Sequence, residues 1–121
     1  MALRVVNLTL GGMRNISGIM HAGIERHREE MARLCRRFGV RTLEMFGSAL
    51  GAEFTPESDI DFLVEFGEPC VFNAFEQYFG LKEGLEQLLG RTIDLVVASS
   101  IRNPVFRAEV ERTKQPLYAA A

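Results

Sequence analysis

The stretch from residue 46 to residue 66 restricts the fold of this 121-residue chain more than any other feature. One expected strand ends at Phe46, a Gly-Ser turn follows, and a second expected strand over residues 59–66 opens with Asp59 and Asp61. Because side chains along a strand alternate between its two faces, both aspartates point to one face. The positions on the other face are all apolar: Ile60, Phe62, Val64 and Phe66. The sequence therefore predicts a sheet that packs on a core and carries two carboxylates at an accessible rim.

Two carboxylates on one face repel each other unless a positive charge lies between them. Mg²⁺ suits such a pair, because it usually takes one or two protein carboxylates together with substrate phosphates. Gly47 permits unusual dihedral angles and close approach of the backbone. Ser48 adds a hydroxyl at a turn that could open a helix N-terminus, where exposed N–H groups bind phosphate. The stretch is typical of a site for a nucleoside triphosphate and its metal.

At these residues the chain resembles a known family. Gly47-Ser48, ten intervening residues and then Asp59-x-Asp61 are similar to the signature of the minimal nucleotidyltransferases, in the polymerase-beta-like nucleotidyltransferase superfamily. Among them, the chain most resembles the small antitoxins that pair with HEPN-domain ribonuclease toxins. The resemblance implies a small α/β domain, the minimal nucleotidyltransferase fold, with a twisted mixed sheet and helices packed mainly on one face. We expect this domain to cover residues 21–118, after an N-terminal extension of unknown role over residues 1–20.

The resemblance also implies roles for individual residues. Asp59 and Asp61 would hold two Mg²⁺ ions. Asp94 would be a third metal ligand on a neighbouring strand and would help to deprotonate the acceptor. Gly47 and Ser48 would anchor the β- and γ-phosphates. The implied reaction moves AMP from ATP to a tyrosine of a partner HEPN toxin, which silences the toxin.

Asp94 stands inside an otherwise apolar expected strand, and its sequence alone leaves two interpretations open. Burying an unpaired carboxylate costs several kcal/mol, so Asp94 should have a partner. The structural alternative is an ion pair with Arg41, Arg91 or a similar residue. The functional alternative is a metal ligand beside Asp59 and Asp61, and the third carboxylate of the family pattern favours it.

One departure from the family pattern concerns the triphosphate. Many relatives carry a basic residue directly after the Gly-Ser pair, whereas residues 49–51 here read Ala-Leu-Gly. Arg41, Lys82 and Arg91 are the candidates for the missing cation.

The acceptor has to come from elsewhere, because a chain of this length leaves no room for a separate substrate-binding domain. A protein acceptor on a partner chain, in a hetero-oligomer, fits this size best. Two alternatives stay open: a non-catalytic module that masks its partner, and a small-molecule nucleotidyltransferase completed by oligomerisation.

Helical spacing of apolar residues predicts helices over residues 21–38, 72–89 and 101–113. Gly39 is expected to end the first helix, and Asn103 to cap the last one. The second helix is expected to bury one side, and Gly80 and Gly84 weaken it or bend it. That side consists of Phe72, Phe75, Tyr78, Phe79, Leu85, Leu88 and Leu89.

Further strands are expected over residues 40–46 and 91–97, with an edge strand over residues 115–118. In the first of these, simple alternation places four residues on one face: Val40, Thr42, Glu44 and Phe46. In the strand over residues 91–97, the apolar face consists of Ile93, Leu95 and Val97.

The bulk composition excludes several classes of protein. The formal net charge of −2 gives no overall basic field, so direct nucleic-acid binding is not expected. Cys35 and Cys70 do not follow a metal-binding spacing and are expected to be reduced thiols, with Cys35 facing the core. No apolar run is long enough to span a membrane, and the N-terminus does not resemble a signal peptide, so we expect a cytoplasmic protein.

Overall fold

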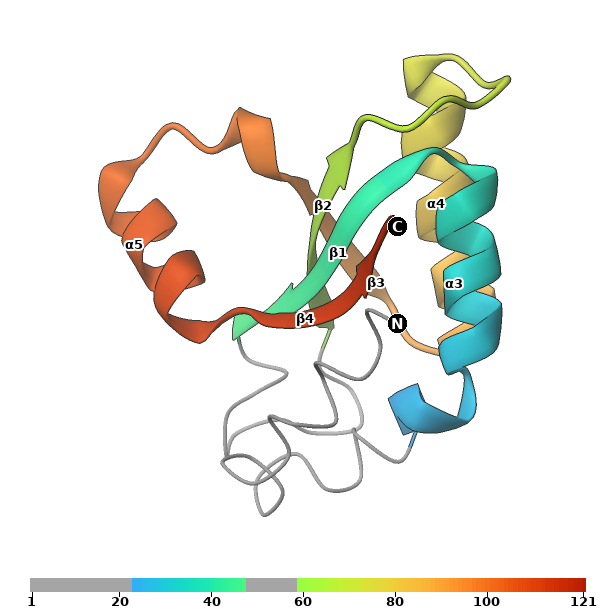
Figure 1. Cartoon of the computed structure of the whole chain (residues 1–121). Helices are drawn as coiled ribbons and strands as arrows, with labels where there is room; N and C mark the ends of the chain where they lie inside the picture. Colours follow the sequence, from blue (N-terminus) through green and yellow to red (C-terminus); the bar gives the residue numbers. More distant parts are fainter. Residues whose placement is uncertain (1–22, 48–58) are drawn as a thin grey trace.

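The computed structural model describes residues 23–47 and 59–121. The expected N-terminal extension over residues 1–20, and Ser48, lie outside this part of the chain. Within it, four strands form one sheet in the order β3-β2-β1-β4 (Figure 1). They are β1 (Val40–Phe46), β2 (Ile60–Phe66), β3 (Ile93–Val97) and β4 (Gln115–Ala119). β1 is antiparallel to β2 and β4, and β2 is parallel to β3, so the sheet is mixed, as predicted.

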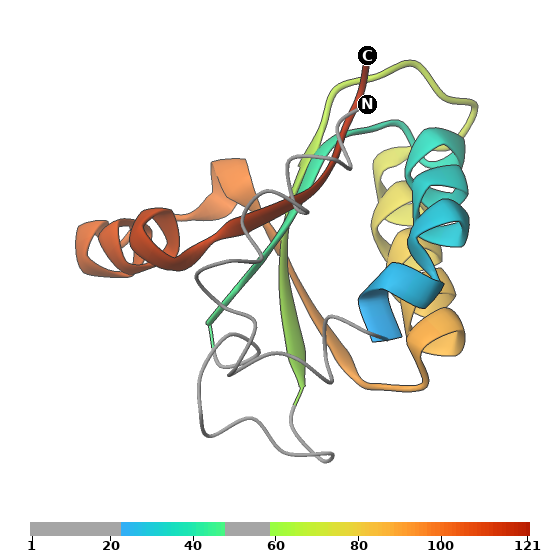
Figure 2. The same cartoon turned by 60° about the horizontal axis from the view of Figure 1, so that its bottom comes forward.

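Among the elements of the described residues, α-helices cover both faces of the sheet, with a pair on one side and a single helix on the other. α3 (Arg28–Arg37) and α4 (Ala74–Leu89) lie next to each other on one face, and α5 (Pro104–Thr113) lies on the opposite face (Figures 1 and 2). A short 3₁₀ helix, η2 (Ala98–Ser100), connects β3 to α5. The prediction of a small α/β domain with helices mainly on one face is confirmed. No helix in the described part of the chain has both the length and the apolar character needed to cross a membrane.

The ends of the helices follow from their capping residues. Asn103 accepts hydrogen bonds from the N–H groups of the first turn of α5, with a proline at the first helical position, as predicted. Asn73 and Glu76 form a capping box at the start of α4. Gly39, which follows α3, adopts a φ of 68°, a conformation that glycine reaches without strain. The expected first helix is interrupted, because residues 23–26 are helical but a turn at His27 precedes α3.

The main core lies between the sheet and the α3–α4 pair. Its fully buried residues include three of the four residues predicted for the apolar face of β2, Ile60, Phe62 and Val64, whereas Phe66 is only partly buried. Each fully buried side chain of this kind contributes roughly 1.5–3 kcal/mol. α3 and α4 pack closely because two glycines of α4 face α3. A Cβ atom at Gly80 would overlap the ring of Phe38, and one at Gly84 would lie 2.7 Å from Leu34. Both glycines are therefore contact positions, and α4 is a single helix through them.

A smaller core lies on the other face of the sheet, under α5. Its buried members come from β1, β2, the η2–α5 connection and α5: Phe46, Leu63, Ile101 and Val110. This second core fixes α5 over the face of the sheet that carries the aspartates.

Two expectations about packing are wrong, and the end of one strand differs by one residue. The pairing of β1 with β2 shifts its register between Val40 and Thr42, which is a β-bulge. The bulge turns Val40 into the main core instead of onto the face of Phe46. Phe75 and Phe79 of α4 are exposed, and they contact each other. The last strand continues to Ala119, one residue beyond the expected edge strand.

Candidate active site

Three neighbouring strands carry the candidate residues at the same end of the sheet. At this end, the C-terminus of β1 lies beside the N-termini of β2 and β3, so that Phe46 pairs with Asp61 and Asp61 pairs with Asp94. Residues directly opposite each other on paired strands point to the same face. Leu63 and Val96, two positions further along, contact the core under α5. Phe46, Asp61 and Asp94 therefore form one row across three strands, on the α5 side of the sheet.

Asp59 lies directly before β2 and is exposed. The N–H of Ile60 donates to the carbonyl of Thr92 at 3.0 Å, which joins the start of β2 to the start of β3. Asp59 thus lies at the same end of the sheet as Asp61 and Asp94. Among the described residues, however, no three His, Cys, Asp or Glu side chains form a group that could hold a metal ion. The strand register places Asp61 directly opposite Asp94, whereas Asp59 lies one position before β2.

Asp94 is exposed, which differs from the expectation of a buried carboxylate. β3 is an edge strand, and the α5 side of the sheet is covered over Leu63 and Val96 but not over Asp94. The exposure removes the desolvation cost, so Asp94 needs no partner for that reason. The expected alternative of an ion pair with Arg41 is wrong, because Arg41 contacts Glu65 and Glu68 instead.

Gly47 follows β1 and approaches Asp61 closely. Its φ is 77°, in the left-handed region that favours glycine. A Cβ atom at this position would lie 2.5 Å from Oδ2 of Asp61. A larger residue at this position would displace the carboxylate, which agrees with the interpretation of Gly47 as a position of close approach. Its expected phosphate partner Ser48 lies outside the described residues.

The donor set fits Mg²⁺. Asp61 and Asp94 offer only carboxylate oxygens, the ligands that this hard cation prefers, and Mg²⁺ needs only one or two of them beside substrate phosphates. Paired strands lie about 4.8 Å apart, so the two carboxylates are within reach of one ion. The assignment of Asp59 as an additional ligand stays a prediction.

The three candidate cations occupy different places. Arg41 is at the other end of the sheet, since it precedes Phe46 by five strand positions of roughly 3.3 Å each. Nζ of Lys82 bonds Glu86 at 2.7 Å, and this hydrogen bond raises the pKa of Lys82, to which the charge of Asp94 adds. Arg91 lies two residues before β3, at the same end of the sheet as the aspartates. Arg91 and Lys82 are therefore better placed than Arg41.

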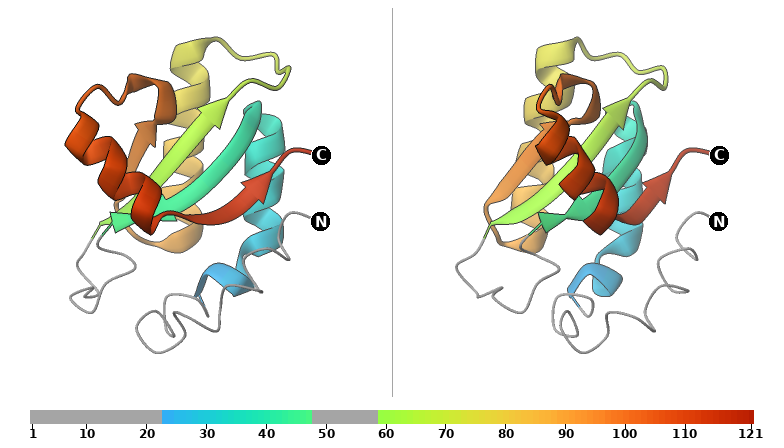
Figure 3. Two further views of the ribbon diagram at one scale, coloured as in Figure 1. Left: turned by 60° about the vertical axis from the view of Figure 1, so that its left-hand side comes forward. Right: turned by 90° about the vertical axis from the view of Figure 1, so that its left-hand side faces the viewer.

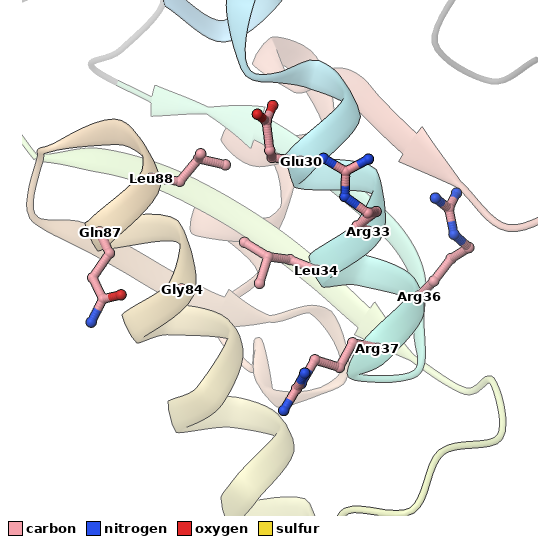
Figure 4. Close-up of a pocket in the computed structure, with 8 residues that line it drawn as sticks. All are labelled: Glu30, Arg33, Leu34, Arg36, Arg37, Gly84, Gln87 and Leu88. Atoms are coloured by element: carbon pink, nitrogen blue, oxygen red, sulfur yellow. The ribbon is translucent and has the colours of Figure 1, made fainter.

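The groove between α3 and α4 is not the candidate site. It has a volume of about 780 Å³, and Figure 4 shows Leu34 and Leu88 between the two helices, with Arg33, Arg36 and Arg37 on α3. The two helices cover the face of the sheet opposite to α5 (Figure 3). The groove is thus separated from Asp61 and Asp94 by the sheet.

Comparisons with known proteins agree with this geometry. The family model of the nucleotidyltransferase domain matches residues 24–116. A candidate protein adenylyltransferase of Methanocaldococcus jannaschii is 40% identical over 75 residues, 62% of this chain and 74% of that protein. The protein adenylyltransferase MntA of Thermococcus cleftensis is 39% identical over 82 residues, 67% of this chain and 76% of that protein.

Solved structures share the fold. A candidate minimal nucleotidyltransferase matches with a TM-score of 0.64 at 34% identity, over 78% of this chain and 92% of that one. A chain from the complex of tri-AMPylated Shewanella oneidensis HEPN toxin with MNT antitoxin matches with a TM-score of 0.55 at 20% identity, over 79% and 72%. A toxin–antitoxin structure with AMP-PNP gives 0.59 at 21%, over 77% and 73%. The last two likenesses concern the fold alone.

The sequence motif, the paired aspartates beside Gly47, the match over residues 24–116 and the related sequences lead to one conclusion. The chain belongs to the nucleotidyltransferase domain family and has the fold of its minimal members.

Proposed function

We propose that this protein transfers AMP from ATP to a hydroxyl group of a partner protein, and that the acceptor is a tyrosine of a HEPN-domain toxin. The observation that carries the proposal is the direct pairing of Asp61 with Asp94, with the backbone of Gly47 against Asp61. A cation bound between two carboxylates at this spacing offsets their mutual repulsion. The site thus has the charge and the open backbone approach that a metal-bound triphosphate needs.

The relatives support the nature of the donor and of the acceptor. Similar proteins are named protein adenylyltransferases, and one of them is MntA. Complexes with the same fold include an AMP-PNP-bound toxin–antitoxin pair and a tri-AMPylated HEPN toxin with its MNT antitoxin. By analogy, ATP is the donor, and modification of the toxin is the antitoxin activity.

In the proposed reaction, the acceptor oxygen forms a bond to the α-phosphorus of ATP. The bond between that phosphorus and the oxygen bridging to the β-phosphate breaks, and pyrophosphate leaves with the electron pair. The acceptor proton passes to Asp94 or to water. Asp61 and Asp94, with Asp59 at the rim, would hold Mg²⁺, which supplies positive charge to the entering and leaving oxygens. Gly47 and Ser48 would hold the β- and γ-phosphates, and Arg91 is the proposed additional cation.

The test uses the protein with the HEPN-domain protein encoded beside it. The two are mixed with ATP and Mg²⁺, and the partner is weighed by intact mass spectrometry. The expected result is the addition of AMP to a partner tyrosine, with loss of the partner's ribonuclease activity. The Asp61→Asn and Asp94→Asn variants should both lose the mass increase. Glu83→Gln, which removes an exposed carboxylate of α4 on the other side of the sheet, should keep it.

The alternative is an antitoxin that only masks its partner. The absence of a basic residue after the Gly-Ser pair favours this alternative, because triphosphate binding then lacks a nearby cation from the motif itself. If the Asp61→Asn variant still neutralises the partner at stoichiometric amounts without any mass change, masking is correct and the enzymatic proposal fails.

A further inference from the structure

The aromatic ring of Phe106 on α5 lies beside the row formed by Phe46, Asp61 and Asp94. Phe46 is 5% exposed, and the ring of Phe106 covers it. The two ring centroids are 5.9 Å apart with an interplanar angle of 70°. Phe106 itself is 40% exposed.

Phe106 is close to the candidate metal ligands by way of a short chain of contacts. Phe46 is directly opposite Asp61 in the antiparallel pair of β1 and β2. Opposite residues in such a pair have Cα atoms roughly 4.5–5.5 Å apart. One strand spacing and one ring contact therefore separate the carboxylate of Asp61 from the ring of Phe106, and both lie on the α5 side of the sheet.

We propose that Phe106 is the stacking position for the base of the nucleotide. This inference rests on the proposed function, because it names the part of the site that binds the base of ATP. A triphosphate held at Asp61 and Gly47 leaves its nucleoside to extend beyond the row of Phe46, Asp61 and Asp94. Among the described residues, the exposed ring of Phe106 offers an aromatic surface at the Phe46 end of that row. Stacking of a base on an aromatic side chain contributes free energy without hydrogen bonds and tolerates any base.

The surroundings of Phe106 favour a base over a charged group. The side chain of Asn103 already accepts from the N–H groups of Val105 and Phe106, so the first turn of α5 does not offer these donors to a phosphate. The neighbouring Val105 is 77% exposed and apolar. Val105 and Phe106 thus present an apolar surface with one aromatic face, and stacking on such a face tolerates any base. We therefore expect ATP and GTP to bind with similar affinity.

The first experiment uses the absence of tryptophan from the chain. Phe106→Trp introduces a single tryptophan, whose fluorescence is measured as ATP or inorganic tripolyphosphate is added in the presence of Mg²⁺. ATP should quench the emission, and tripolyphosphate should not. Phe75→Trp is the matched control, because Phe75 is an exposed phenylalanine of α4 on the other side of the sheet. Its emission should respond to neither ligand.

The second experiment measures binding by calorimetry. Phe106→Ala should weaken ATP binding about five- to tenfold, the lower end of the range for loss of a stacked base, and should leave tripolyphosphate binding unchanged. Phe106→Tyr should restore the affinity, and Phe75→Ala should have no effect. Circular dichroism checks that each variant is folded.

The outcomes separate this inference from the proposed function. If wild type binds ATP and tripolyphosphate with equal affinity, or if Phe106→Trp does not respond to bound ATP, base stacking is wrong while nucleotide binding stands. If Phe106→Ala slows transfer to the partner without changing ATP affinity, the ring contacts the acceptor instead, and the inference again fails. If neither ligand binds wild type in the presence of Mg²⁺, both proposals fail.

Discussion

Asp61 lies directly opposite Asp94 in the parallel pair of β2 and β3, in a stretch without any shift of register. The two side chains share one face of the sheet at about 4.8 Å strand spacing, and the edge position of β3 leaves Asp94 open to solvent. Like charges directly opposite each other on paired strands are destabilising. Removal of one of the two charges should therefore leave stability unchanged or raise it, and should lower activity.

We predict that Asp94→Asn keeps the fold and loses transfer activity. Without Mg²⁺, its free energy of unfolding should equal that of wild type or exceed it by up to about 1 kcal/mol, because one of two repelling charges is gone. AMP transfer should fall by at least about 100-fold, the scale for losing one electrostatic contact to the transition state. Urea unfolding and intact mass spectrometry measure the two quantities. A variant that transfers AMP at the wild-type rate would make Asp94 a surface residue without function.

The sequence was sufficient to place Asp61 on the face opposite to the apolar residues of its strand. Alternation in the strand over residues 59–66 separated Asp61 from Ile60, Phe62 and Val64, and the structure has the same division. The local signals at Gly39 and Asn103 were also sufficient, because a cap acts on its own helix and needs no tertiary contact.

Features that depend on the order of the strands or on helix crossings were not predictable. The exposure of Asp94 follows from the edge position of β3, and no local pattern encodes this position. Phe75 and Phe79 recur at helical spacing like core residues, yet the glycines turn another side of α4 toward α3. The turn of Val40 into the main core arises from a bulge between strands, which alternation within one strand does not reveal.

The two glycines of α4 should respond differently to substitution by alanine. At both positions, alanine gains about 1 kcal/mol of helix propensity. At Gly80 the new methyl group would overlap the ring of Phe38, and overpacking costs typically 1–3 kcal/mol. At Gly84 its neighbour is a terminal methyl group of Leu34, which can rotate away. Thermal unfolding should show Gly80→Ala destabilised and Gly84→Ala close to wild type. Equal effects at both positions would contradict the described contact between α3 and α4.

The two cysteines should differ in reactivity. Cys35 is fully buried, and burial raises the pKa of its thiol to about 12, whereas Cys70 is half-buried. Because the thiolate is the reactive form, iodoacetamide at pH 8 should alkylate Cys70 in the folded protein and Cys35 only after unfolding. Peptide mass spectrometry locates the label. Rapid labelling of Cys35 in the folded protein would show that α3 opens locally.

The same shift of pKa makes stability depend on pH above 9. The folded-state pKa of Cys35 is higher than its ordinary value of 9.0, so its contribution is complete below pH 9. As the pH rises from 9 toward 12, the unfolded chain loses the proton first, and the folded state is destabilised by about 1 kcal/mol at pH 10. The free energy of unfolding of wild type, measured with urea, should decline more steeply over this pH range than that of Cys35→Ala. Parallel declines would mean that Cys35 ionises equally in both states.

Gly47 and Gly90 provide a matched pair for the function of the Gly-Ser turn. Both have a positive φ, 77° and 66°, so alanine at either position should cost roughly 1–2 kcal/mol of backbone strain. A Cβ atom at Gly90 would meet nothing within 4 Å, whereas one at Gly47 would lie 2.5 Å from Oδ2 of Asp61. Both variants should therefore be less stable than wild type in urea, and only Gly47→Ala should displace the carboxylate of Asp61. Calorimetry with ATP and Mg²⁺ at a temperature where both are folded should show binding lost in Gly47→Ala and retained in Gly90→Ala. If Gly47→Ala binds ATP as tightly as Gly90→Ala does, close approach at Gly47 serves only the turn and the phosphate site lies elsewhere.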